Sequence, residues 1–150
     1  LIFKEIFPFN CHDIKLINGD TFGYINGSKE INTEKYLLGG LTLWNVATNE
    51  KDFLPSNRYG FSKFTANHKY NIFACAEYGL DPQINVYSYP DKEIIYTFES
   101  ISSQMYSHFV DPGQLDVIDL FISRNGKRLL AVFGCPKYEI KVWDLESGEE

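Results

Sequence analysis

The hydrophobic positions of the chain fall into short segments separated by turn-forming residues, which predicts strands rather than helices. Apolar and polar residues alternate clearly in the last predicted strand, at 138–145. Two middle segments, NIFACA at 71–76 and LLAVF at 129–133, are instead nearly continuous apolar runs. A continuous run in a strand implies that both faces of its sheet are covered, and in an antiparallel repeat the neighbouring units have to supply that cover.

The same pattern predicts an outer strand at 2–7 and three further groups of strands. The groups are 13–18, 21–26, 39–46 and 50–54; then 60–66, 71–77, 83–89 and 94–99; then 116–123, 128–134 and 138–145. Asn125-Gly126 is a two-residue turn signal between the first two strands of the last group.

Three ten-residue segments align without gaps and indicate an internal repeat. They are LTLWNVATNE (41–50), INVYSYPDKE (84–93) and IKVWDLESGE (140–149). Each carries an aromatic anchor, which is Trp44, Tyr87 or Trp143, followed by a turn-forming stretch that ends at a Glu. The anchors lie 43 and 56 residues apart in the sequence. Their fixed place in each unit predicts packing between units rather than stacking on a ligand.

A second block repeats upstream of the last two anchors. Residues 61–76 align without gaps on 118–133, which pairs Phe64 with Phe121 and places a one-residue difference in the loop after the second strand. A period of about 40–45 residues with four strands is typical of β-propeller blades. The sequence therefore predicts an all-β fold, with about three blades of a larger ring of about seven.

The whole chain, 1–150, is expected to form this partial propeller and to belong to a longer polypeptide, because three blades would leave an edge unpaired. The expected blades are a degenerate blade one at about 10–54, blade two at about 58–99 and an incomplete blade three at about 115–150.

The last unit carries the residues of a known family. IKVWDLESGE resembles the closing signature of a WD repeat, with Trp143-Asp144 as its dipeptide, and ISRNGKRLLAVFG resembles the hairpin that precedes it. Blade one has Asn45 at the position of the Asp and blade two has Ser88, and the Gly-His pair of many WD repeats is absent. The buried His–Ser–Asp–Trp hydrogen-bond set of that family therefore cannot form in full.

A narrower resemblance covers residues 73–99. The run FACAEYGLDPQINVYSYPDKEIIYTFE, with the element Phe22-Gly23-Tyr24 before it, is similar to the first blades of cilia- and flagella-associated WD-repeat proteins. The resemblance implies a non-catalytic scaffold in the cytoskeleton of the ciliary or flagellar axoneme, involved in dynein-driven motility. Its implied partners are axonemal complex subunits, dynein-associated proteins or tubulin. The alternatives are a cytosolic WD-repeat adaptor outside cilia and a propeller hydrolase.

Two long stretches interrupt the spacing of the strands, 27–40 inside blade one and 100–114 between blades two and three. In a propeller both connections open onto the same face, and insertions gathered on one face are typical of a contact surface. Tolerance of surface loops is the alternative interpretation. The residues expected to contact partners are Lys29, Glu30, Lys35, Tyr36, Met105, Tyr106, His108 and Phe109.

Charge and cysteine content bear on the classes of partner and on the cellular compartment. Asp and Glu outnumber Lys and Arg by 20 to 14, and the resulting net charge of −6 argues against binding nucleic acid or an anionic membrane. No apolar run approaches the length of a transmembrane helix. The odd number of widely spaced cysteines matches neither a disulfide framework nor a zinc pattern, which favours a reducing cytoplasmic compartment. The cysteines are Cys11, Cys75 and Cys135.

Candidate chemistry is sparse. Cys11-His12-Asp13 has the residue types of a catalytic triad, but consecutive strand residues point to opposite faces and cannot form a relay. A metal site that added His68 and Cys75 to Cys11 and His12 would need long-range convergence without a local motif. We therefore expect no catalysis, small-molecule substrate, cofactor or metal.

The hairpin tip between the first two strands of blade three is basic, with Arg124, Lys127 and Arg128. It is interpreted as a solvated tip, and contact with an acidic protein tail is the alternative. His108 lies among serines in the 100–114 stretch, where a solvated side chain is expected rather than a nucleophilic site.

Overall fold

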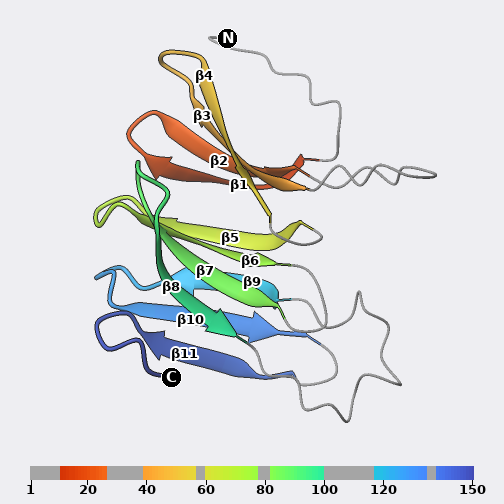
Figure 1. The fold of residues 1–150 in the computed structure, drawn as a ribbon, viewed down its shortest axis with the longest axis vertical. Helices are drawn as coiled ribbons and strands as arrows, with labels where there is room; N and C mark the ends of the chain where they lie inside the picture. The colour runs from red at the N-terminus through yellow and green to blue at the C-terminus, as the bar shows by residue number, and fades with distance from the viewer. Residues whose placement is uncertain (1–10, 27–38, 57–59, 78–81, 100–116, 135–137) are drawn as a thin grey trace, which may run out of the picture.

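A computed structural model of the protein describes residues 11–26, 39–56, 60–77, 82–99, 117–134 and 138–150. Within these ranges the regular structure consists of β-strands in three separate antiparallel sheets, with no helix. The predicted all-β fold with about three blades is confirmed. We call the sheets blade one, blade two and blade three, and they stack from top to bottom in Figure 1.

Each blade is a meander in which every strand pairs with its neighbour in sequence. Blade one consists of β1 (Cys11–Asn18), β2 (Thr21–Asn26), β3 (Gly40–Asn45) and β4 (Glu50–Pro55). Blade two consists of β5 (Phe61–Asn67), β6 (Ile72–Glu77), β7 (Gln83–Ser88) and β8 (Ile94–Glu99). Blade three consists of β9 (Val117–Ile122), β10 (Arg128–Phe133) and β11 (Ile140–Asp144).

Eleven of the predicted strands are present, with bounds that agree to within two residues. The strand predicted at 2–7 lies outside the described residues. The agreement reflects the short apolar segments and the turn residues between them, which fix where each strand begins and ends.

The turn after the third strand has the same form in all three blades. Asn49, Lys92 and Gly148 each adopt a left-handed backbone conformation there, with φ of 61°, 60° and 77°. In blade two the Ser88 amide donates to the Glu93 carbonyl at 2.9 Å, and in blade three the Asp144 amide makes the same bond to Glu149 at 2.8 Å. The ten-residue sequence repeat therefore corresponds to a repeated turn structure.

The register of the second repeated block differs from the prediction by one residue. In blade two Phe64 pairs with Cys75, whereas in blade three Leu120 pairs with Ala131. The counterpart of Phe64 is therefore Leu120 and not Phe121, and blades two and three align at the anchor spacing of 56 residues throughout. The continuous apolar runs of the middle strands caused the error, because they hold no alternation that would fix which face each residue occupies.

Two apolar clusters lie between the sheets and form the core. Blades one and two share a cluster of Ile17, Ile25, Leu41, Leu43, Phe61, Phe64, Phe73, Cys75 and Tyr87. Blades two and three share a cluster of Ala74, Ala76, Ile84, Val86, Phe98, Val117, Leu120, Leu129, Ala131, Phe133, Trp143 and Leu145. We call the face that a sheet turns toward the next blade its forward face, and the opposite face its backward face.

The middle strands of blades two and three differ in how far their two faces are buried. In β6 the residues from Phe73 to Glu77 are all buried, so the prediction of cover on both faces holds for blade two. In β10 burial alternates, with Leu129, Ala131 and Phe133 buried and Leu130 and Val132 only half-buried. No described sheet lies beyond blade three, so cover on both of its faces stays a prediction.

The register predicts opposite outcomes for two adjacent residues. Leu120→Ala removes a fully buried side chain from the core and should cost about 2–5 kcal/mol of unfolding free energy. Phe121→Ala truncates a half-exposed side chain on the other face and should cost no more than about 1 kcal/mol. Urea unfolding in dilute solution measures both values, and a larger loss for Phe121→Ala would contradict the register.

Candidate functional site

The aromatic anchors occupy equivalent positions on the backward faces of the three blades. Tyr87 is buried against blade one and stacks on Phe73 with ring centroids 5.1 Å apart. Trp143 is buried against blade two and stacks on Phe98 of that blade at 5.0 Å. Burial raises the pKa of the Tyr87 hydroxyl well above its ordinary value, so the group stays neutral. These two anchors lie in the packing between blades.

Trp44 is only half-buried, because no described blade covers the backward face of blade one. Its Nε1 donates to Oδ1 of Asn49 at 3.1 Å, and the Lys51 ammonium lies 5.3 Å from the centre of its ring. The side chain is thus held by local contacts at a position that the other two blades bury.

The residue after each anchor supplies a hydrogen-bond acceptor to the turn that follows. Oδ1 of Asp144 accepts from the amides of Glu146 at 2.8 Å and Ser147 at 3.2 Å. These bonds, with weaker contributions from nearby cations, hold the pKa of the Asp144 carboxyl below its ordinary value. In blade one, Oδ1 of Asn45 accepts from two amides of its turn in the same way. This position therefore stabilises a turn in blades one and three.

A polar contact that the sequence did not reveal joins blades one and two. Asp13 and Lys15 of β1 form an ion pair at 3.0 Å. Oδ2 of Asp13 accepts from the Phe64 amide at 3.0 Å, and Nζ of Lys15 donates to the Phe64 carbonyl at 2.5 Å. Asp13 has a φ of 56° at an irregularity of β1, so its backbone conformation sets this contact. The only sequence signal is the i, i+2 spacing of the two charges, which many exposed strands share.

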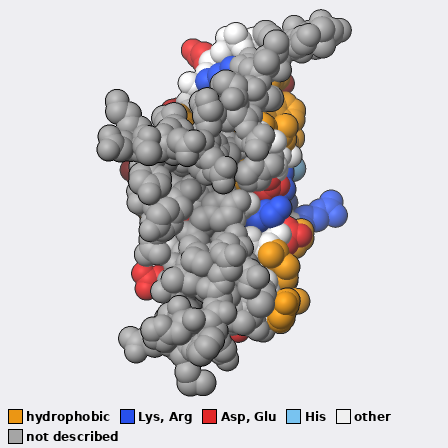
Figure 2. Space-filling model, turned by 90° about the vertical axis from the view of Figure 1, so that its right-hand side faces the viewer, with side chains coloured by type: hydrophobic (Ala, Val, Ile, Leu, Met, Phe, Trp, Pro, Cys, Tyr) orange, Lys and Arg blue, Asp and Glu red, His pale blue; other side chains and the backbone are white. Residues whose placement is uncertain are grey.

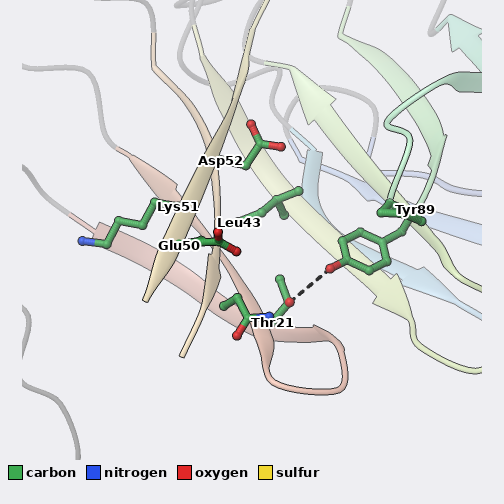
Figure 3. Close-up of a pocket in the computed structure, with 8 residues that line it drawn as sticks. Thr21, Leu43, Glu50, Lys51, Asp52 and Tyr89 are labelled. Carbon is green, nitrogen blue, oxygen red and sulfur yellow. Dashed lines mark hydrogen bonds between the residues drawn. The ribbon is translucent and has the colours of Figure 1, made fainter. Parts of the chain in front are cut away.

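A groove of about 480 Å³ lies between blades one and two (Figure 3). It is lined by residues of β2, β3 and β4 of blade one and of the turn after β7 of blade two. The Tyr89 hydroxyl donates to Oγ1 of Thr21 at 3.1 Å across it, and Lys92 forms an ion pair with Asp52. The hydrogen bond from Lys92 holds the pKa of the Asp52 carboxyl below its ordinary value. The groove is lined by Thr21, Leu43, Asn45, Glu50, Lys51, Asp52, Tyr89 and Pro90.

These eight lining residues include no His, Cys or Ser, so they offer no nucleophile paired with an imidazole base. The groove has two acids, one of which is neutralised by Lys92, and an aromatic wall from Tyr89. The groove therefore combines charged, polar and aromatic side chains between blades one and two.

The residues expected to contact partners, Lys29, Glu30, Lys35, Tyr36, Met105, Tyr106, His108 and Phe109, lie outside the described residues. The strand ends on either side of them are described. Asn26 pairs with Gly40 where the 27–40 stretch leaves and rejoins blade one. Glu99 pairs with Gln83, and Val117 with Phe133, around the 100–114 stretch. These strand ends lie on the same side of the three sheets, on the right of Figure 1.

The residues considered for catalysis or metal binding are dispersed. Cys75 is buried between blades one and two, and its desolvation raises the pKa of the thiol well above the ordinary value. His68 is exposed in the turn after β5, and Cys11 is half-buried at the start of β1. Among the described residues, no three His, Cys, Asp or Glu side chains gather as a metal site would require. The His12 side chain, His108 and Cys135 lie outside the description.

The basic hairpin tip of blade three is matched by acids of the neighbouring turn. Nζ of Lys127 lies 2.7 Å from Oε1 of Glu146, and the Arg128 guanidinium lies 3.5 Å from Asp144. At least one partner of each pair is exposed, so each pair stabilises the fold only weakly. Figure 2 shows a similar mixture on another side, where apolar side chains reach the surface beside acidic and basic ones.

No protein-family model matches the chain, and no curated protein matches its sequence. Its fold does match solved structures. The β-propeller domain of the Trilobed protease from Pyrococcus furiosus has a TM-score of 0.62 and 16% identity, over 93% of this chain and 40% of that chain. Hsv2p of Kluyveromyces lactis has a TM-score of 0.52 and 15% identity, over 93% of this chain and 50% of that one.

The chain therefore spans half or less of the length of these two structures. At this identity the likeness establishes the fold alone, and the protein is a partial β-propeller. None of the described residues lies in a helix that is long and apolar enough to cross a membrane.

The turn contact of Asp144 predicts a pH-dependent loss of stability. Asp144→Ala removes the acceptor for two amides and should lower the urea midpoint at pH 7, whereas Asp144→Asn keeps an acceptor and should lower it less. Because folding lowers the pKa of this carboxyl, its contribution is full above the unfolded value of about 3.9 and is lost as pH falls through the folded value.

The difference between the wild type and Asp144→Ala should therefore shrink between pH 5 and pH 2, as measured by urea unfolding at each pH. A difference that stayed constant over this range would show that the charge of Asp144 does not contribute to the turn.

Proposed function

We propose that the protein is a non-catalytic scaffold that binds other proteins through the face of the propeller that carries the 27–40 and 100–114 stretches. The observation that carries this proposal is how the described side chains are used. The anchors Tyr87 and Trp143 pack between blades, and Asn45 and Asp144 support turns. The residues that line the groove between blades one and two include no nucleophile with an imidazole base. A propeller of this kind offers a surface for contacts and holds it rigidly.

We further propose that this scaffold is a WD-repeat protein of the ciliary or flagellar axoneme, where it takes part in dynein-driven motility. The similarity of residues 73–99 and of the element at 22–24 to axonemal WD-repeat proteins supports this proposal, as does the Trp143-Asp144 dipeptide. Its partners would be axonemal complex subunits, dynein-associated proteins or tubulin. A cytosolic WD-repeat adaptor outside cilia is the alternative, and it would use the same surface.

Replacement of residues 100–114 by a Gly-Ser linker of equal length should leave the fold intact and weaken partner binding at least about tenfold. The strand ends at Glu99 and Val117 remain in place, so urea unfolding should change little. Co-purification from extracts, followed by quantitative mass spectrometry, measures the loss of partners.

Lys127→Ser is the matched control, because this residue lies in the turn at the opposite end of β9 and the substitution removes an exposed ion pair without changing its backbone hydrogen bonds. Equal recovery of partners with the replaced stretch and with this control would contradict the proposed contact surface.

Binding to purified axonemes separates the axonemal proposal from the adaptor alternative. The labelled protein should sediment with salt-washed axonemes and saturate, and the 100–114 replacement should reduce the bound fraction. Saturable binding to a cytosolic fraction from which cilia have been removed, together with no binding to axonemes or microtubules, would favour the adaptor outside cilia.

A further inference from the structure

The groove between blades one and two is built by two neighbouring sheets of the stack. Thr21 and Leu43, which are buried, lie on its blade-one side, and Tyr89 and Pro90 lie on its blade-two side (Figure 3). Because the groove lies between two described blades, a further blade at either end of the stack would not fill it. Its accessibility is therefore a property of the fold.

The register of β3 and β4 determines which charged side chains reach the groove. Leu43 pairs with Asp52, so Asp52 and also Glu50, two residues earlier, share the forward face with Leu43. Trp44 pairs with Lys51 on the backward face, where the Lys51 ammonium lies 5.3 Å from the centre of the Trp44 ring. The Lys51 side chain accordingly points away from the groove, and the Glu50 carboxylate points toward it (Figure 3).

The two acids of the groove differ in their partners. Asp52 forms an ion pair with Lys92 of blade two. The Glu50 carboxylate accepts a hydrogen bond from Oγ1 of Thr48 at 3.0 Å, and no cation among the residues that the structure describes forms an ion pair with it. The groove therefore holds one carboxylate, positioned by its own turn, whose charge no described cation neutralises.

Tyr89 gives the groove an aromatic side that is held in place at two points. Its hydroxyl donates to Oγ1 of Thr21 at 3.1 Å, and its amide donates to the Asn71 carbonyl at 2.8 Å. An aromatic ring and a carboxylate in one groove are the two groups that a guanidinium recognises, since its plane stacks on a ring while its N–H groups donate to an acid.

We propose that this groove binds an arginine side chain of a partner protein. The guanidinium stacks on the ring of Tyr89 and donates to the Glu50 carboxylate, while the methylene groups of the arginine pack against Leu43 and Pro90. Lysine has neither the planar face nor the fork of donors, so arginine is preferred. An anionic side chain is repelled by the charge of Glu50.

The arginine site is separate from the contact surface proposed above. The groove is lined by Thr21 at the start of β2 and by Asn45 at the end of β3. The 27–40 stretch leaves and rejoins blade one at the other ends of these strands, where Asn26 pairs with Gly40. The proposal therefore adds a second binding site, and its failure would leave the test with the 100–114 replacement unaffected.

An NMR titration of the wild-type protein with the capped peptide acetyl-Gly-Arg-Gly-amide tests the site. The methyl resonances of Leu43 and the amide resonance of Thr21 should shift and saturate, with a dissociation constant on the order of 1 mM. The same peptide with citrulline in place of arginine keeps the shape and loses the charge, and it should bind at least about threefold more weakly, as should the lysine peptide.

Two variants test the groups assigned to the guanidinium. Glu50→Gln removes the charge but keeps an oxygen that can accept from Thr48, and it should raise the dissociation constant about fivefold. Tyr89→Leu removes the ring and should raise it about threefold. Glu93→Gln is the matched control, because Glu93 is an exposed acid of the same turn as Tyr89 that does not line the groove, and it should leave the dissociation constant nearly unchanged.

Three results would each overturn the proposal: no saturable shift at the groove, equal binding of the arginine and citrulline peptides, or equal effects of Glu50→Gln and Glu93→Gln. Equal binding of the lysine peptide would overturn the assignment to arginine. The comparison of peptides uses the wild-type protein alone, so it decides the question even if a variant fails to fold.

Discussion

The structure depends on one constraint: a sheet whose two faces are both apolar has to be covered twice. Blade two meets this constraint, because blade one covers the backward face of β6 and blade three covers its forward face. Since an antiparallel meander has no crossover helices to supply the cover, neighbouring sheets are the available source. Stacking of like units follows directly, and so does the expectation that any blade at an end of the stack exposes an unsatisfied face.

The division of side chains between the two faces explains how the stack stays regular. Backward faces hold the large aromatic residues, such as Phe64, Phe73 and Tyr87, at positions fixed by the repeat. The forward face of β6 holds Ala74 and Ala76, in the same cluster as Trp143. Close packing of this kind excludes voids without demanding identical residues in each blade. Asp13 and Lys15 of blade one also bind the backbone of Phe64, and this contact joins β1 to β5 across the interface between the two sheets.

The strands, the turns and the fold class could be predicted from the sequence, but the register of blade three could not. The strand bounds were predictable because turn residues end each apolar segment, and the ten-residue repeat predicted the turns after β3, β7 and β11. The register was not predictable, because LLAVF has an apolar residue at every position. Both Leu120 and Phe121 were therefore suitable counterparts of Phe64. The contact between Asp13 and Phe64 was also invisible, since it joins residues 51 positions apart through a local irregularity of β1.

The position after each anchor shows how far a signature dipeptide can identify a protein. Asp144 and Asn45 both accept hydrogen bonds from two amides of the next turn, although only one of them completes the Trp-Asp pair. Ser88 of blade two instead accepts from the amide of Glu93, five residues further on. Because Asp and Asn both meet the same local need, the Trp-Asp pair indicates the geometry of the turn and does not by itself identify a family. The proposed binding of partners therefore rests on the face that carries the 27–40 and 100–114 stretches, and the repeat itself does not argue for any particular partner.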